Sequence, residues 1–504
     1  MTQGNGLSDG YTATLNRLKA QKGNKSTLGL KVLMWVLYSE RPLKIEELRH
    51  ALGVELESTD LDHENIPALR TLLASSLGLV TVEVSSSTLR LVHFTLQEHL
   101  LSDSTLFHSS HSTIAGACLT YLNFQCVRDL SPALDSAPKT MPLLKYASYY
   151  WGEHTRKGMT ENVKILALRL LDKFDEHISA QLLSLHYNRR GIRRCLFEFD
   201  CEKGPIGFTG LHGASFLGIV EIFAAVLEMK GWDFNARDNA SFTPLIWAAV
   251  KGHEEVVKML LERGDVNLDL ADNKWSLTPL MWAAVQGHKG VVKVFLEREI
   301  VNPNQANSVY GPIALYMAAL YGEEGVVKMI LEREDVNPNQ IPAGRTRTPL
   351  SVAATNGQGW VVKMLLTRVD VNPNIADTSY CRTPLADAAV RGHEGIIKML
   401  LERNDVRIDI RDEQNQTALS LARSRGFSQI ATMISERATK SDTADPGSQE
   451  SLPSSAGDED EFMAETEPSD DYSNTNTTKP SREPTSPPAN PIHQKGVKRR
   501  RLCS

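Results

Sequence analysis

The chain has little that would support a disulfide framework, membrane insertion or general attraction to nucleic acid. Its 504 residues include only six cysteines, and no two of them form a CxxC pair. Scattered cysteines are typical of a reducing compartment, so we expect neither a disulfide scaffold nor a zinc module. No apolar run is long enough to span a bilayer, and we expect no membrane contact. The net charge of −6 predicts no general attraction to nucleic acid.

Motifs for catalysis are also missing from the sequence. No phosphate-binding loop of the form GxxxxGK[ST] occurs, and the fragment 23–26 (GNKS) lacks the upstream glycine and the preceding strand. Cys195 and Cys201 are near each other, but no His or Cys partner stands at metal-ligand spacing. Candidate nucleophiles and bases occur without any motif context. We therefore predict that the protein is not an enzyme and that it holds no cofactor and no metal.

What the sequence has instead is a motif that recurs every 35 residues. From Thr243 it reads TPLIWAAVKGHEEVVKMLLERGDVN, and from Thr278 it reads TPLMWAAVQGHKGVVKVFLEREIVN. Further copies begin at Ile313, Thr348 and Thr383, and degenerate copies begin at Thr209 and Thr417. A fixed period of this size indicates a solenoid in which each unit contacts only its neighbours.

The residue types within the motif predict a pair of short helices. The Thr243 hydroxyl can cap the first free N–H groups of a helix, and Pro244 fits its first turn. Gly252 can end that helix because glycine adopts the left-handed conformation at little cost. Apolar residues then return at helical spacing over 256–261, which predicts a second helix. One such pair cannot bury its apolar face alone, whereas stacked pairs can.

These residues resemble the ankyrin repeat over about 205–436, where seven units fit. The period of 35 exceeds the usual 33 and indicates a longer finger between units. The histidine of the family's first helix is present only at His212; the later copies carry Ile246, Met281, Tyr316, Ser351 and Ala386. The resemblance implies a mainly α solenoid of helix-turn-helix repeats with β-hairpin fingers. It also implies that a protein ligand binds to the fingers and to the exposed ends of the first helices.

The candidate protein-binding residues are those that vary between copies while the scaffold residues stay nearly the same. At the ends of the first helices they are Val250, Lys251, Val285, Gln286, Leu320, Tyr321, Thr355, Asn356, Val390 and Arg391. In the fingers they are Phe242, Leu277, Arg347 and Arg382. Selection for a binding surface on a fixed frame would produce this contrast, although drift at exposed positions would look similar.

The N-terminal region predicts a winged helix. Helices are expected over 28–38, 45–52 and 63–76, a hairpin over 79–93, and a further helix over 94–101. Residues 111–195 read as helical with loops, and 165–185 is an amphipathic stretch.

The segments 30–55, 78–100 and 146–154 resemble the winged helix that follows the NACHT nucleotidase in fungal NACHT–ankyrin proteins, which are receptors of the signal-transducing NTPase class. This winged helix is related to that of inositol-deacylase relatives. Only 27 residues precede the winged helix here, and the stretch 11–23 resembles the last NACHT helix. Without the phosphate-binding loop we expect no hydrolysis of ATP or GTP. A truncated NACHT protein and a stand-alone protein both remain open.

The charge of the winged helix argues against DNA binding. Residues 28–101 carry six Lys/Arg and ten Asp/Glu, a net charge of −4. Because phosphate neutralisation supplies most non-specific affinity, this surface should repel DNA. We expect no direct contact with nucleic acid.

The residues after about 438 differ in composition. Residues 441–471 contain eleven acidic residues and no basic residue, and we expect disorder there. The chain ends near Lys498, Arg499, Arg500 and Arg501, a candidate nuclear import signal or simply a solvated end.

We therefore divide the chain into five parts: 1–27, the residual end of a NACHT-like region; 28–105, a winged-helix domain; 106–204, a helical linker region; 205–436, about seven ankyrin repeats; and 437–504, a disordered acidic tail with a basic end. The first hypothesis is a non-enzymatic protein-binding module, the sensor and relay part of a NACHT–ankyrin receptor, which binds a protein ligand on the concave face of the ankyrin array. It would be cytoplasmic, with import into the nucleus as the alternative. The second hypothesis is a nuclear transcription regulator that uses the winged helix and the ankyrin array. The third is an NTPase fragment that acts together with a NACHT partner.

Overall fold

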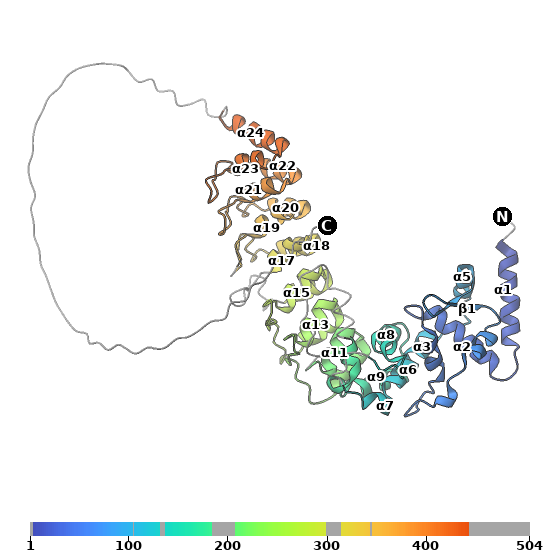
Figure 1. The fold of residues 1–504 in the computed structure, drawn as a ribbon. Helices are drawn as coiled ribbons and strands as arrows, with labels where there is room; N and C mark the ends of the chain where they lie inside the picture. Colours follow the sequence, from blue (N-terminus) through green and yellow to red (C-terminus); the bar gives the residue numbers. More distant parts are fainter. Residues whose placement is uncertain are drawn as a thin grey trace, which may run out of the picture. The chain divides into compact units, whose positions relative to one another are not determined.

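The computed structural model describes residues 4–103, 105–131, 137–183, 207–298, 314–342 and 345–442. Over these ranges the protein is mainly α-helical, with one two-stranded antiparallel sheet (Figure 1). The predicted class, a helical winged-helix region followed by a solenoid of helix pairs, is confirmed. Among the described helices, none combines the length and the apolarity needed to cross a membrane.

The N-terminal part contains helices around one small hairpin. Its elements are α1 (Gly4–Lys19), α2 (Lys25–Tyr38), α3 (Ile45–Gly53), η1 (His63–Asn65), α4 (Leu69–Ser75), β1 (Val80–Glu83), β2 (Thr88–Leu91) and α5 (Phe94–Ser102). The two strands pair from Val80 with Leu91 to Glu83 with Thr88. Helix α2 supplies the centre of this core, because Val32, Leu33 and Trp35 are buried.

One predicted helix of this region is wrong in its extent. Instead of a continuous helix over 63–76, the structure has the single turn η1 and then the short helix α4. Pro67 explains the break, because a proline disfavours helical backbone at the preceding residue. Ile66 accordingly has extended backbone, with φ −75° and ψ 109°.

The following helical region consists of α6 (Ser110–Leu122), α7 (Gln125–Arg128), α8 (Leu144–Lys157), α9 (Glu161–Leu171) and the turn η2 (Phe174–Glu176). The predicted amphipathic stretch 165–185 is not one helix, since α9 ends at Leu171. The chain turns there so that Phe174 is fully buried and the His177 ring donates from Nε2 to the Leu122 carbonyl at 3.0 Å. Residues 184 and 185 lie outside the described ranges, as does most of the predicted linker end.

Seven helix pairs follow in the described residues. They are α11 (Gly210–Leu217) with α12 (Val220–Glu228), α13 (Pro244–Lys251) with α14 (Glu254–Leu261), α15 (Pro279–Gln286) with α16 (Lys289–Leu296), α17 (Ala314–Tyr321) with α18 (Glu324–Leu331), α19 (Pro349–Thr355) with α20 (Gly359–Leu366), α21 (Pro384–Arg391) with α22 (Glu394–Leu401), and α23 (Ala418–Ser424) with α24 (Ser428–Asp442).

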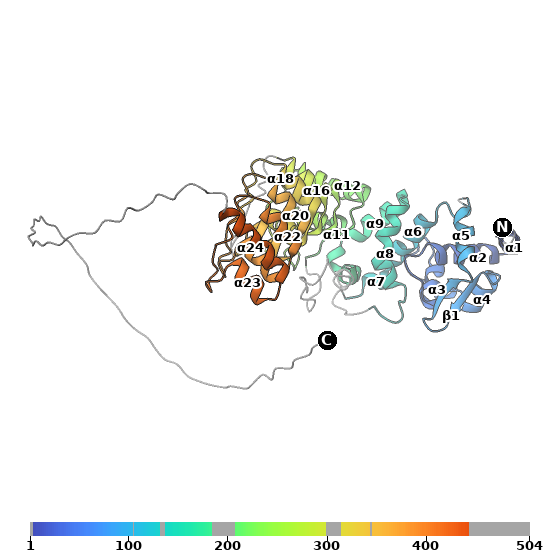
Figure 2. The same cartoon turned by 90° about the horizontal axis from the view of Figure 1, so that it is seen from above.

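The first helices of successive pairs pack against one another in one layer, and the second helices form another. Figure 1 shows α11, α13 and α15 following one another, and Figure 2 shows α18, α20 and α22 side by side. The close approach of first helices requires small side chains, and Ala248, Ala249, Ala283 and Ala284 are fully buried at these contacts.

Each first helix is bounded as the motif predicts. The Thr243 Oγ1 accepts a hydrogen bond from the Ile246 N–H at 3.2 Å, and Thr383 does the same for Ala386 at 3.3 Å. Gly252 ends α13 with φ +74°. In the copy that begins at Ile313, the capping position itself lies outside the described residues.

The fingers differ from the β-hairpins that the resemblance implied. In the described residues they are tight turns without strands. Four of them are closed by a backbone hydrogen bond from an aspartate, for example from the Asp238 N–H to the Phe242 carbonyl at 3.0 Å. The Asp238 carboxylate accepts hydrogen bonds from the N–H groups of Ala240 and Phe242. These backbone donors are therefore not free to pair with a neighbouring strand. Ser241 has φ +61°, which this turn requires.

Three histidines at equivalent positions of the motif each connect their own repeat to the one before it through a hydrogen bond. His253 donates from Nε2 to the Phe216 carbonyl at 2.9 Å, and His288 donates to the Val250 carbonyl at 2.9 Å. His393 donates to the Thr355 carbonyl at 3.1 Å. The histidines that follow these helix-ending glycines therefore belong to the scaffold.

Candidate functional site

Four of the predicted protein-binding residues are buried, and their assignment to the surface was wrong. Phe242, Val250, Leu277 and Val285 are each less than 5% exposed. The Phe242 ring packs between two tryptophans, with ring centroids 5.0 Å from Trp247 and 5.1 Å from Trp282. These side chains turn inward because the base of each finger closes the layer of first helices. A partner therefore cannot contact them directly.

The two finger arginines are half-buried and bound to carboxylates of neighbouring segments. Arg347 donates from Nε to Asp387 at 2.9 Å, and Arg382 donates from Nε to Asp412 at 3.1 Å. Asp387 also accepts hydrogen bonds from the hydroxyls of Ser351 and Thr355. These arginines primarily join adjacent repeats.

The remaining predicted residues reach the surface. Asn356 and Arg391 are exposed, and the others are partly exposed: Lys251, Gln286, Leu320, Tyr321, Thr355 and Val390. Five of them stand at the same place, the end of a first helix, in consecutive units. We call these five the helix-end row: Lys251, Gln286, Tyr321, Asn356 and Arg391.

The helix-end row differs in chemistry from one repeat to the next. The Lys251 ammonium lies 4.5 Å from the centre of the Phe216 ring, and burial lowers its pKa. Burial also raises the pKa of Tyr321, which stays a neutral phenol. The row therefore offers a cation, an amide, a phenol, a second amide and a second cation along stacked helices. Such a set can provide directional contacts to a polypeptide.

The buried aspartates of the fingers were missed in the sequence. Asp238 accepts the Trp247 Nε1–H at 2.8 Å, and Asp272 accepts the Trp282 Nε1–H at 3.1 Å. Burial raises the pKa of Asp238 to about 6, although hydrogen bonds from Phe242, Trp247 and Ala240 oppose this effect. Asp377 and Asp412 occupy the same place in later units. Because these aspartates recur at the period of the repeat, the sequence contained a signal that could have identified them.

Two exposed aromatic residues were also missed. Trp360 at the start of α20 is 63% exposed, and Tyr380 in a finger is 49% exposed. Trp360 has no aromatic counterpart in the neighbouring copies of the motif, whereas Tyr380 occupies the same place in its finger as Trp275 does in an earlier one. The candidate import residues Lys498 to Arg501 lie outside the described residues.

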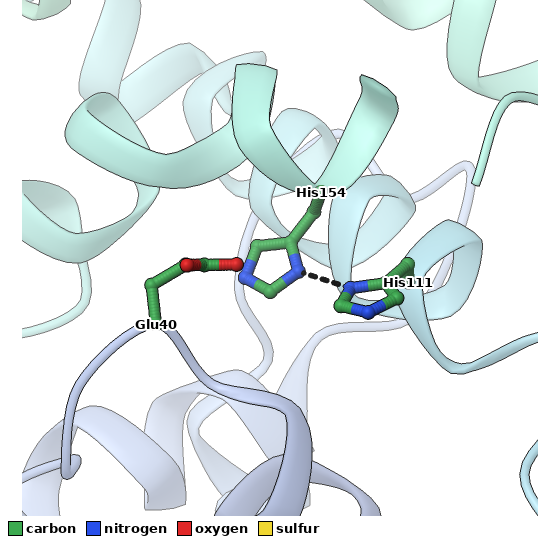
Figure 3. Close-up of side chains that lie close together, drawn as sticks. All are labelled: Glu40, His111 and His154. Atoms are coloured by element: carbon green, nitrogen blue, oxygen red, sulfur yellow. Dashed lines mark hydrogen bonds between the residues drawn. The ribbon is translucent and has the colours of Figure 1, made fainter. Parts of the chain in front are cut away.

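A second polar group lies in the helical region, where three potential metal-ligand side chains come together (Figure 3). Glu40 follows α2, His111 lies in the first turn of α6, and His154 lies in the last turn of α8. One ligand atom from each lies within 4.8 Å of the other two. The His111 Nδ1 and His154 Nδ1 atoms are 3.0 Å apart.

The surroundings of this group lower the pKa of both imidazoles. Burial, with His111 and Lys157 nearby, lowers the pKa of His154 to about 3. Burial and Lys157 likewise lower the pKa of His111. The His154 Nε2 atom is 2.8 Å from the Tyr146 hydroxyl, which also accepts the Glu40 N–H at 3.1 Å. The Lys157 ammonium contacts the Glu40 carboxylate at 2.5 Å.

The helical region contacts the first repeat directly. Helix α9 packs against α11 and α12, and Arg156 donates a hydrogen bond to the Leu217 carbonyl. The Phe174 and Phe208 rings lie 6.0 Å apart between their centroids. A Cβ on Gly213 would stand 2.9 Å from the Phe174 ring, so glycine is required for this approach.

Two family models match this chain, one over the repeats and one over the N-terminal region. A model described as ankyrin repeats (three copies) matches residues 157–270, 211–307, 280–377 and 350–445. A model described as the winged-helix domain of GPI inositol-deacylase matches residues 16–114. A search of curated proteins found no match.

Solved ankyrin structures are similar to about half of the chain. The human ASB11 ankyrin repeat domain is 24% identical, with 45% of this chain and 96% of that chain covered and a TM-score of 0.39. The ankyrin repeat domain of Bcl-3, described as a unique member of the IkappaB family, is 22% identical, with 45% and 97% covered and a TM-score of 0.39. Likeness at this level says nothing of function. The family models cover more than half of the sequence, and the chain belongs to the ankyrin-repeat family, with a winged-helix domain of the GPI inositol-deacylase type before the repeats.

Proposed function

We propose that this chain is a non-enzymatic protein-binding module that captures a protein ligand on the helix-end row of its ankyrin array. The observation that carries the proposal is the contrast within the array. Equivalent scaffold positions hold the same residue types and are buried, whereas the row presents five different polar side chains at the surface. A surface of this kind gives specificity through individual side chains on a rigid frame.

We infer further that the module is the sensor and relay part of a NACHT–ankyrin receptor. The winged-helix match supports this context. The contacts of α9 and Arg156 with the first repeat give a continuous packed route from the array to α8. Helix α6 packs against α8 and α2, which extends the route to the winged helix. Ligand capture on the array would act through these contacts.

Capture by matched surface variants tests the binding surface. The full-length chain is immobilised and its captured proteins are identified by mass spectrometry, beside a variant with Tyr321→Ala, Asn356→Ala and Arg391→Ala. A control variant carries Lys328→Ala, Lys363→Ala and Lys398→Ala, three exposed positions on the second helices of the same repeats. We expect the same proteins to be captured by the wild type and the control and lost from the row variant. Capture that is unchanged in the row variant, or lost equally in both, would contradict the chosen surface.

The absence of catalysis is tested separately. The purified chain is incubated with ATP or GTP and magnesium, and released phosphate is measured. We expect no release above the rate of the buffer. Turnover that persists through repeated purification would contradict the non-enzymatic assignment without bearing on the binding surface.

A further inference from the structure

The three side chains of Glu40, His111 and His154 come from separate elements that fold together only in the tertiary structure. Glu40 belongs to the loop between α2 and α3, whereas the histidines belong to α6 and α8. Figure 3 shows the His154 ring between the other two side chains, with His111 on one side of it and the Glu40 carboxylate on the other. Two imidazoles and one carboxylate form a ligand set that zinc and other first-row divalent ions prefer.

The distance between the two imidazole nitrogens is close to the distance between two nitrogens that bind the same metal ion. Bonds of about 2.0–2.1 Å in a tetrahedral site separate two ligand nitrogens by about 3.3 Å. The Nδ1 atoms of His111 and His154 are 3.0 Å apart, where one proton now joins them. A cation in place of that proton requires the two rings to separate slightly and to turn so that both nitrogen lone pairs point at the cation. The Glu40 carboxylate, on an exposed loop residue, has a ligand atom within 4.8 Å of a nitrogen of each histidine, whereas the same geometry needs about 3.3 Å between ligand atoms.

The hydrogen bond at the other ring nitrogen of His154 favours metal binding through Nδ1. A histidine that binds a metal through one nitrogen usually donates its other N–H to a fixed acceptor. The Tyr146 hydroxyl lies 2.8 Å from the His154 Nε2 atom and is itself buried. Donation from Nε2 to Tyr146 leaves the Nδ1 lone pair of His154 directed at His111.

Lys157 opposes metal binding in the present arrangement. Its ammonium contacts Glu40 at 2.5 Å and would be repelled by a divalent cation. The Lys157 side chain is 46% exposed, however, and can turn into solvent. The ion pair thus competes with the metal for the same carboxylate.

We propose that Glu40, His111 and His154 form a zinc-type divalent metal site that fastens the loop after α2 to helices α6 and α8. This site was not expected from the sequence. It depends on none of the residues of the helix-end row, so its failure and the failure of the proposed protein binding are distinguishable.

Metal binding by the full-length chain tests the proposal. Zn²⁺ alone is titrated calorimetrically into metal-free protein, and Co²⁺ is used as a spectroscopic probe of the ligands. We expect one equivalent to bind, with a d–d spectrum of low symmetry and no thiolate charge-transfer band. A thiolate band would assign the metal to cysteine, and no uptake at all would equally overturn the proposal.

Variants separate the three ligands from general surface binding. His111→Ala should abolish the Zn²⁺ heat and the Co²⁺ spectrum, and Glu40→Gln should weaken binding. His108→Ala, an exposed histidine three residues earlier, is the matched control and should bind as the wild type does. Wild-type affinity in His111→Ala would contradict the site.

Two further variants avoid the risk that a change at buried His154 prevents folding. Tyr146→Phe should weaken Zn²⁺ binding by about 10–100-fold, because it removes the partner of His154 Nε2. Lys157→Met should strengthen Zn²⁺ binding, since it removes the competing ammonium. Weaker binding in Lys157→Met would contradict the assignment of Glu40 as a ligand.

Discussion

Arg347 donates from Nε to the Asp387 carboxylate at 2.9 Å, across the boundary between two repeats. This pair occupies the positions that Phe242 and Trp282 occupy in the earlier repeats, where the two rings pack 5.1 Å apart. The same place in the solenoid is therefore filled by an aromatic contact in one half and by an ion pair in the other. Both solutions join the finger of one repeat to the first helix of the next.

Removal of the Asp387 carboxylate should destabilise the array strongly. Asp387→Ala leaves Arg347, Ser351 and Thr355 without their common acceptor, and Asp377 at 4.0 Å is the nearest remaining carboxylate for Arg347. We expect a loss of about 2–4 kcal/mol in the free energy of unfolding, measured by urea denaturation.

Asp409→Ala is the matched control for that experiment. Asp409 pairs with Arg407 at 2.8 Å, but both side chains are more than 60% exposed. Exposed ion pairs contribute little to folding stability, so the loss in the free energy of unfolding should be below about 1 kcal/mol. Equal losses in Asp387→Ala and Asp409→Ala would show that the buried pair does not hold the repeats together.

Gly252 should not tolerate a side chain. Its φ is +74°, and a Cβ would stand 2.6 Å from the His288 Nδ1 atom, which belongs to the next repeat. Gly252→Ala should lower the stability by about 1–3 kcal/mol through backbone strain and displacement of His288. Gly264→Ala, where a Cβ meets nothing within 4 Å, should be nearly neutral. The melting temperatures of Gly252→Ala and Gly264→Ala are measured by thermal denaturation. Equal melting temperatures would contradict the expected clash at Gly252.

His212 should make the first repeat sensitive to acid. Burial lowers its pKa to about 4, opposed by hydrogen bonds to the Ala236 and Phe242 carbonyls. Between pH 6.5 and pH 4 the unfolded chain binds a proton at this residue and the folded chain does not. Folding stability from this residue therefore falls as the pH falls, by about 3 kcal/mol over the whole interval.

The variant His212→Met isolates this effect, because Met281 fills the same position in a later repeat. Urea denaturation is measured from pH 7 to pH 4.5 for both proteins. The buried Asp238 titrates with the opposite sign, since its raised pKa makes the folded state bind the extra proton. The test is thus the difference between the two slopes, which should correspond to about one proton. Identical slopes would mean that His212 titrates normally in the folded protein.

The protein should not bind DNA through its winged helix. The segment 28–101 has a net charge of −4, and helix α4 is only seven residues long. In a mobility-shift assay at low salt, where electrostatic attraction is strongest, the full chain should leave duplex DNA unshifted. A shift that weakens with added salt would favour the transcription-regulator hypothesis instead.

Much of the fold follows from local signals that a single sequence contains. Thr243, Pro244 and Gly252 act within one helix, through a cap, a fixed backbone angle and a left-handed residue. Their repetition in register specifies the stacked pairs. The breaks at Pro67 and after Leu171 were missed. Proline at the first break is a local signal, whereas the second depends on where Phe174 becomes buried.

The candidate surface was predicted only in part. Variation between repeats correctly marked exposed positions such as Asn356 and Arg391. It also marked Phe242 and Leu277, which are buried. Variation indicates that a position is not fixed by the repeat itself, but it does not distinguish a solvent-facing residue from one that packs against a different neighbour in each unit.

The sequence by itself determined the repeat, its helix boundaries and its order along the chain, because caps, turns and helical periodicity act over a few residues. Only the tertiary structure decided which variable side chains face inward and which reach the surface, because that depends on the neighbouring repeat. It alone also placed His111 beside His154, 43 residues later in the chain. Side chains so far apart in sequence meet only when helices pack, and no local pattern encodes that contact.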